Sequence, residues 1–213
     1  MNLTERYSKK LGEKVEQAEV KLDGVLLQLE VTNACNHRCI FCPNMDSTRK
    51  RKMMDESLAR RVMEECAGFL GEDKKICFHM NGEPFLYKKL PELVKYSKDL
   101  GFDYSFVTTN GSLADKELLV RIFDAGLDSI KFSINAGSRE TYKEIHGADD
   151  FDKAMNALRF SWNYRKESKK GYKIFVSCVG IKNNYGELEE FNRIAEQYCD
   201  EIIFYYPCAY AGQ

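Results

Sequence analysis

The chain has 213 residues, of which 44% are hydrophobic and 31% charged, and its formal net charge is −1 at pH 7. This balance is typical of one soluble globular domain and excludes a disordered chain. The near-neutral charge gives no reason to expect nucleic acid or an anionic membrane as a partner. No apolar run is long enough to span a bilayer, and the polar start lacks the apolar centre of a secretory signal. A cytoplasmic location is therefore predicted.

Strand-like and helix-like segments alternate along the chain. Short segments rich in β-branched and aromatic residues predict six strands. These segments are residues 25–32, 75–80, 103–109, 129–135, 172–179 and 201–206. Residues 1–22 are expected to form an N-terminal helical extension in front of a single domain at 23–213.

Apolar residues of the intervening segments recur at helical spacing. The first such stripe consists of Leu58, Val62, Cys66 and Leu70. The next consists of Leu90, Leu93, Val94 and Ser97. Glycines that follow the last periodic residue predict left-handed C-caps, and they are Gly71, Gly101 and Gly126.

Six strands joined by helical crossovers form a parallel sheet in an α/β fold. Periodicity alone leaves two architectures open, an open doubly wound sheet and an incomplete barrel, because a closed TIM barrel needs eight strands. Polar loops follow the predicted strands, and the carboxyl ends of parallel strands meet at one rim. A pocket is expected at that rim.

Three of the eight cysteines, Cys35, Cys39 and Cys42, lie in a CxxxCxxC run after the first predicted strand. Three thiolates suit an iron–sulfur cluster or zinc. Bound to a four-iron cluster, they would leave one iron open for another molecule. A structural zinc site or an electron-transfer ferredoxin needs a fourth ligand, and His37 inside the run is not expected to turn onto the same metal.

The run CNHRCIFC, the NGEP segment after the second strand and the strand-end segments TNG and SIN resemble the radical S-adenosylmethionine superfamily. The resemblance covers the chain after about residue 22 and implies a partial (β/α)6 TIM-type barrel, a parallel six-stranded sheet with outer helices. Within the superfamily the chain resembles members that carry a C-terminal SPASM or twitch extension. Because it stops soon after the sixth strand, either a truncated chain or a minimal enzyme is expected, with Cys208 as a first auxiliary-cluster ligand in the former case.

The resemblance also implies roles for individual residues. Cys35, Cys39 and Cys42 would bind three irons of a 4Fe-4S cluster, and S-adenosylmethionine would chelate the fourth. Further cofactor contacts would come from Phe41 near the adenine, from Asn81, Gly82 and Glu83 with the last two beside the methionine amino group, and from Ser133 and Asn135 near the ribose or carboxylate. An electron donor such as flavodoxin or ferredoxin would supply one electron, and the resulting 5′-deoxyadenosyl radical would abstract hydrogen from a peptide, protein, sugar or small metabolite.

One position departs from the family pattern. Asn81 stands where the family usually has the first glycine of its GGEP motif, and asparagine tolerates the left-handed backbone that such a turn could require. The turn is therefore expected to persist.

Several alternatives stay open from the sequence. The cysteine run could serve a non-catalytic iron–sulfur module or a zinc-stabilised scaffold. Strand alternation places Glu30 and Lys131 on inward faces, where they could form a buried ion pair or contact substrate, and His79 raises the same question. The basic run at residues 49–52 is read as a solvated face, with a clamp for an anionic substrate as the minority interpretation.

Overall fold

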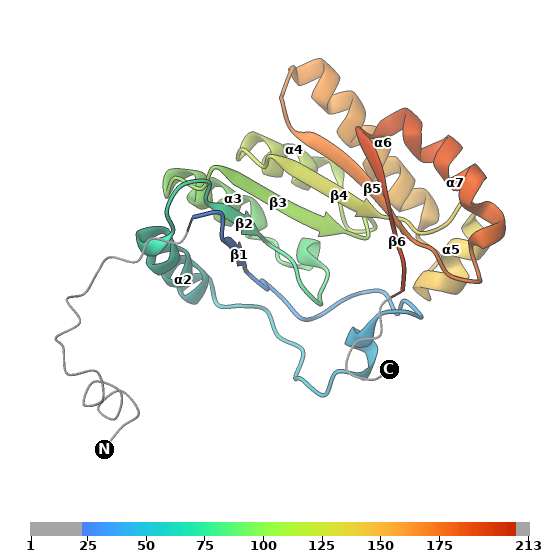
Figure 1. Cartoon of the computed structure of the whole chain (residues 1–213), viewed down its shortest axis with the longest axis horizontal. Helices are drawn as coiled ribbons and strands as arrows, with labels where there is room; N and C mark the ends of the chain where they lie inside the picture. Colours follow the sequence, from blue (N-terminus) through green and yellow to red (C-terminus); the bar gives the residue numbers. More distant parts are fainter. Residues whose placement is uncertain (1–22, 208–213) are drawn as a thin grey trace.

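The computed structural model describes residues 23–207; the helix expected in residues 1–22 and the cysteine at position 208 lie outside this range. All six strands pair in parallel and stand in chain order from β1 to β6 (Figure 1). The strands are β1 (Leu26–Gln28), β2 (Lys75–Cys77), β3 (Tyr104–Thr109), β4 (Ser129–Ser133), β5 (Lys173–Val179) and β6 (Glu201–Tyr205).

Helices connect the strands. The α-helices are α2 (Glu56–Phe69), α3 (Leu90–Asp99), α4 (Lys116–Asp124), α5 (Arg139–His146), α6 (Phe151–Ser168) and α7 (Leu188–Ala195). Short 3-10 turns are η1 (Pro43–Asp46), η2 (Pro84–Leu86), η3 (Tyr185–Glu187) and η4 (Glu196–Tyr198).

The strictly sequential strand order decides between the two architectures that periodicity left open. A doubly wound sheet reverses its strand order at a switch point, whereas successive right-handed crossovers in one direction put every helix on the same face. Figure 1 shows the sheet with its helices along one side and its edges at β1 and β6. The prediction of an open, six-stranded partial barrel is confirmed.

The first two strands are shorter than predicted. β1 ends at Gln28, and after one further bond to β2, from Leu29 N–H to Cys77 O at 2.8 Å, the chain pairs with the returning loop. There Met54 N–H donates to Val31 O at 2.8 Å, and Thr32 bridges Met53 in antiparallel fashion. The segment that follows β1 is thereby held beside residues 52–54, where it leads into the cysteine run.

The core lies between the sheet and the helices. The stripe predicted for α3 is correct, since Leu90, Leu93 and Val94 are fully buried. The stripe predicted for α2 is correct in three of its four positions: Leu70 belongs to the core, and Val62 and Cys66 pack against it. Leu58 is 39% exposed, and the adjacent Ala59 is fully buried together with Met63.

Two of the three predicted glycine caps are left-handed. Gly101 and Gly126 have φ values of 79° and 97°. Gly71 is not left-handed; instead a Cβ atom there would lie 1.8 Å from Asp23 Oδ1, so close packing explains this glycine. None of the helices within residues 23–207 combines the length and apolar character that crossing a bilayer requires.

Candidate functional site

The loop that carries the three cysteines is held by its own polar side chains. Thr32 Oγ1 donates to Lys52 O at 2.9 Å, and Asn33 Oδ1 accepts from Lys52 N–H at 2.7 Å. The Arg51 guanidinium donates to Asn33 O at 2.8 Å and also bonds Asn44. Residues 49–52 are all exposed, as expected of a solvated face, but Arg51 also fixes the loop and Arg49 pairs with Glu30.

The three thiols are unpaired and lie close enough together for the charges of Cys42 and Cys35 to act on Cys39. Cys35 is exposed, while Cys39 and Cys42 are half-buried, and Cys42 N–H donates to Cys39 O at 3.0 Å. Burial, followed by the negative charges of Cys42 and Cys35, raises the pKa of Cys39 to about 12. A bare thiolate is therefore disfavoured at this position, and the positive charge of a bound metal would remove the penalty.

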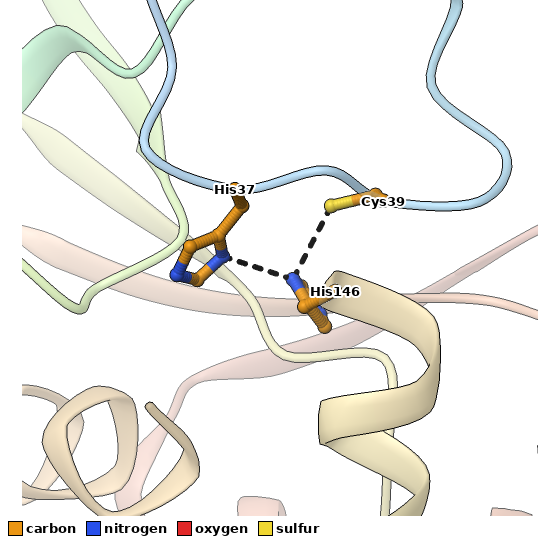
Figure 2. Close-up of side chains that lie close together, drawn as sticks. All are labelled: His37, Cys39 and His146. Atoms are coloured by element: carbon orange, nitrogen blue, oxygen red, sulfur yellow. Dashed lines mark hydrogen bonds between the residues drawn. The ribbon is translucent and has the colours of Figure 1, made fainter. Parts of the chain in front are cut away.

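His37 turns toward Cys39, contrary to the sequence-based expectation. Figure 2 shows the side chains of His37 and Cys39, which come from the cysteine loop, beside that of His146, which comes from α5. His146 Nδ1 lies 3.4 Å from Cys39 Sγ and 3.3 Å from His37 Nδ1. Ligand atoms of these three residues all lie within 4.8 Å of one another. His37 Nε2 also contacts Asp150 Oδ2 at 3.2 Å, which fixes the ring from its far side.

Glu83 is buried, with 3% of its surface exposed. Its carboxylate accepts hydrogen bonds from Thr109 Oγ1 at 2.7 Å, Asn110 N–H at 2.8 Å and Phe85 N–H at 3.1 Å. Burial nevertheless dominates and raises the pKa of Glu83 to about 7. Glu83 thus ties the end of β3 to η2 from a buried position.

Gly82 packs directly against the start of the cysteine loop. A Cβ atom there would lie 2.1 Å from Thr32 O and 2.7 Å from Ala34 O. The adjacent Glu83 N–H donates to Ala34 O at 2.8 Å. The glycine of NGEP is therefore required for close approach of two backbones.

Asn81 does not adopt the left-handed conformation that its replacement of glycine suggested, since it is absent from the positive-φ residues among those described. Its backbone N–H lies 3.3 Å from Glu30 Oε1. The turn persists because only Gly82 is sterically critical, so position 81, the first of the NGEP segment, tolerates a side chain.

The two polar side chains of the SIN segment, Ser133 and Asn135, differ in burial and in hydrogen bonding. Asn135 is fully buried with φ of 60°; its Oδ1 accepts from Val179 N–H at 2.8 Å, and its Nδ2 lies 3.2 Å from His146 Nε2. Ser133 is half-buried, and its hydroxyl has only 3.5 Å contacts, with Asn135 Nδ2 and Ser177 Oγ. Ser133 is therefore the freer of the two to meet a bound molecule.

Phe41, Glu30 and Lys131 are the remaining residues that the sequence singles out. Phe41 is half-buried beside Cys42. The suggested ion pair between Glu30 and Lys131 does not form: Glu30 pairs with Arg49, and Lys131 Nζ donates to Tyr205 OH at 2.8 Å.

Sequence reasoning missed His146 and Asp150, which complete the surroundings of Cys39. Their separation from the cysteine run exceeds 100 residues, with His37 and His146 alone 109 positions apart. A histidine in the last turn of a short helix carries no local signal of such a contact. Asn110 was singled out only as part of a strand-end segment, yet its amide donates to Asn36 Oδ1 at 3.0 Å beside Cys35.

Known proteins resemble this chain in sequence and in fold. The family model described as "Radical SAM superfamily" matches residues 29–195. An uncharacterized protein of Methanocaldococcus jannaschii is 28% identical over 85% of this chain and 57% of its own length. GTP 3′,8-cyclase of Chlorobaculum tepidum is 35% identical over 62% of this chain and 39% of its own.

Two solved structures show the same fold. Streptococcus suis SuiB bound to S-adenosylmethionine superposes with a TM-score of 0.70 at 18% identity, over 98% of this chain and 45% of that one. The enzyme anSMEcpe with bound AdoMet and Cp18Cys peptide superposes with a TM-score of 0.69 at 16% identity, over 89% of this chain and 52% of that one. The chain thus spans about two-fifths to three-fifths of the proteins it resembles.

Proposed function

The chain belongs to the radical S-adenosylmethionine superfamily, and we propose that it holds a 4Fe-4S cluster on Cys35, Cys39 and Cys42 and cleaves S-adenosylmethionine by one-electron reduction. The observation that carries the proposal is the presence of three unpaired thiols on one loop, which is held by its own polar side chains and contacts Glu83, Asn110 and His146 beyond the ends of β2, β3 and β4. When bound, the cluster and S-adenosylmethionine supply a 5′-deoxyadenosyl radical that takes hydrogen from the substrate.

The donor set fits such a cluster. Thiolates are the ligands that iron–sulfur clusters take, and the burial of Cys39 disfavours its thiolate unless a metal cation compensates. Three protein thiolates leave one iron without a protein ligand. In the proposal that position belongs to the amino and carboxylate groups of S-adenosylmethionine.

The chain's own residues position and enclose this site. Gly82 and Glu83 hold the cysteine loop against the end of β2, and Glu83 also fixes Thr109 and Asn110. We infer that Phe41, the Asn81–Gly82 backbone, Ser133 and Asn135 line the S-adenosylmethionine site, with Ser133 the most available side chain and Asn135 acting chiefly on the shape of the strand end. Pre-formed support of this kind limits the geometry open to a reactive radical.

Anaerobic reconstitution with iron and sulfide tests the cluster assignment. The wild type should take up about four iron atoms per chain, and the EPR spectrum of the dithionite-reduced protein should change on addition of S-adenosylmethionine. A variant with Cys35→Ala, Cys39→Ala and Cys42→Ala should bind no cluster, whereas Cys66→Ala, outside the loop, should behave as the wild type. Full iron uptake by the triple variant, or a spectrum insensitive to S-adenosylmethionine, would refute the proposal.

A second candidate function rests on the grouping of His37, Cys39 and His146 (Figure 2). Two imidazole nitrogens and a thiolate suit zinc, and Asp150 behind His37 is a typical supporting partner. A zinc-stabilised scaffold would be colourless, would keep its metal in a Cys35→Ala, Cys42→Ala double variant and would lose it in His146→Ala. The cluster proposal predicts the opposite pattern for the double variant.

The proposal includes a reductant and a compartment. A 4Fe-4S cluster must be reduced before cleavage, so a low-potential donor such as flavodoxin or ferredoxin is required, and the reducing cytoplasm is the expected location. The substrate class remains between peptide or protein and sugar or small metabolite; the sequence relatives named as GTP 3′,8-cyclases favour a small molecule.

A further inference from the structure

A polar patch lies on the sheet face opposite the helices and has no role in holding the cluster. It consists of His79 after β2, Thr108 on β3, Lys131 on β4 and Tyr205 on β6. Lys131 alternates with the fully buried core residues Ile130 and Phe132, which places it on the face away from the core. Thr108 is its register partner on the neighbouring strand, so the two side chains share this inner face.

His79 presents a donor that is only weakly satisfied within the protein. Its Nδ1 accepts the backbone N–H of Thr108 at 2.9 Å, so a neutral ring carries its proton on Nε2. Burial, and then the charge of Lys131, lower the pKa of His79 to about 4, which keeps the ring neutral at pH 7. Within residues 23–207 the partner nearest to Nε2 is the weakly accepting Cys77 Sγ, at 3.7 Å.

Lys131 presents an uncompensated cation. Its Nζ donates to the neutral Tyr205 OH at 2.8 Å and lies 5.0 Å from the centre of the Tyr205 ring. No carboxylate in the described part of the chain comes within ion-pair distance of it. An ammonium group has three protons, and this contact uses one of them.

Thr108 gives a second, independent indication. Among the residues that the structure describes, its Oγ1 is the only buried side-chain nitrogen or oxygen without a hydrogen-bond partner. An unsatisfied buried hydroxyl destabilises a fold, and such a group calls for a bound water, ion or ligand as its partner. This hydroxyl lies on the strand between those of His79 and Lys131.

We propose that this patch binds an oxyanion group of the substrate, a carboxylate or a phosphate, through His79, Thr108, Lys131 and Tyr205. Every member can donate a hydrogen bond, one member is cationic, and none is a carboxylate, so the patch matches an acceptor with negative charge. The inference rests on the proposed function, since it names the substrate class of the same site.

Ring-nitrogen NMR provides the test, because the chain has only three histidines. Cluster-loaded protein with 15N-labelled histidine is titrated with inorganic phosphate and, separately, with acetate. The His79 Nε2 signal should shift with one or both probes, and the probe that acts at lower concentration identifies the oxyanion. The shift should vanish in Lys131→Met, persist in Lys131→Arg and persist in the matched control Lys95→Met on the exposed side of α3. A signal unmoved by both probes, or moved equally in Lys131→Met, would overturn the proposal.

Thr108→Val keeps the inference testable even if Lys131→Met does not fold. Valine has the same shape but no unsatisfied hydroxyl, so thermal stability without probe should stay the same or rise. Probe affinity should fall roughly tenfold, as expected for one lost hydrogen bond to a charged group. A purely structural hydroxyl would give the reverse: lower stability and unchanged affinity. These binding readouts need no turnover, so failure of S-adenosylmethionine cleavage would count against the proposed function alone.

Discussion

Glu83 shows how far the environment of a residue can shift its chemistry. Its carboxylate is buried and accepts three hydrogen bonds, all from groups on η2 and at the end of β3. The hydrogen bonds favour the ionised form, but burial outweighs them and the pKa rises from 4.5 to about 7. The residue therefore joins two loops of the site at an electrostatic cost that depends on pH.

This cost predicts a pH dependence of folding. Because the folded state binds the Glu83 proton more tightly than the unfolded chain, the residue's contribution to stability is fully present below pH 4.5 and is lost as the pH rises through about 7. The loss amounts to about 3 kcal/mol in total. Urea unfolding of the cluster-free protein across this window should show a steeper fall in the free energy of unfolding than in Glu83→Gln.

The control is Glu92→Gln, an exposed position on α3 whose profile should follow that of the wild type. Parallel profiles for Glu83→Gln and the wild type would show that Glu83 does not titrate in this window.

Residue-level chemistry was predictable where it is local in sequence. The spacing of Cys35, Cys39 and Cys42 indicated a metal site without any structure. The contact of His146 with Cys39 was not predictable, because it depends on how α5 packs beside the cysteine loop. The same holds for Lys131, whose partner Tyr205 lies 74 residues away.

At the scale of elements, the NGEP turn and the cysteine loop form one unit. Gly82 has no room for a Cβ atom because the backbone oxygens of Thr32 and Ala34 lie against it. The loop in turn is fixed by bonds from residues 32 and 33 to Lys52. A change at the turn should therefore be transmitted to the cysteines.

Gly82→Ala tests this coupling. The clash involves backbone atoms that cannot rotate away, so we expect a loss of about 1–3 kcal/mol in stability, as for overpacked interiors, together with reduced iron uptake. Gly68→Ala is the matched control: it lies in the last part of α2 with open space around it and should raise stability by up to about 1 kcal/mol. Thermal unfolding and iron analysis measure both effects, and normal iron uptake by a folded Gly82→Ala protein would disprove the coupling.

Helices and strands were predicted well where their hydrophobic period is clear, as in α3 and β3. The errors have physical causes. β1 was overestimated because its continuation looks like a strand but pairs with the loop at residues 52–54. The α2 stripe is wrong at Leu58 and omits Ala59 and Met63, because several adjacent positions are apolar and only packing against the sheet selects among them.

At the scale of the molecule, sequential strand order produces the one-sided sheet on which the account depends. The helices cover one face and leave the other to polar side chains, including Lys131 and Thr108. The cluster loop follows β1, and the residues that support it follow β2, β3 and β4. One rim thus brings together the proposed cluster ligands, the residues that support them and the donors of the proposed oxyanion patch.

The fold class followed from alternation of strands and helices, but the choice of a partial barrel did not, because strand order is a property of tertiary pairing. The substrate is still harder to predict from sequence patterns than the fold. Its recognition depends on side chains that become neighbours only when four strands assemble, as His79, Thr108, Lys131 and Tyr205 do.

The central claim is that this chain cleaves S-adenosylmethionine, and the formation of 5′-deoxyadenosine tests it most directly. The anaerobically reconstituted protein is incubated with dithionite and S-adenosylmethionine, and the nucleoside is quantified by chromatography and mass spectrometry. We expect 5′-deoxyadenosine from the wild type and from Cys66→Ala, and none from the triple variant of Cys35, Cys39 and Cys42. Equal amounts from the wild type and the triple variant, or none from a wild type whose reduced cluster demonstrably binds S-adenosylmethionine, would contradict it.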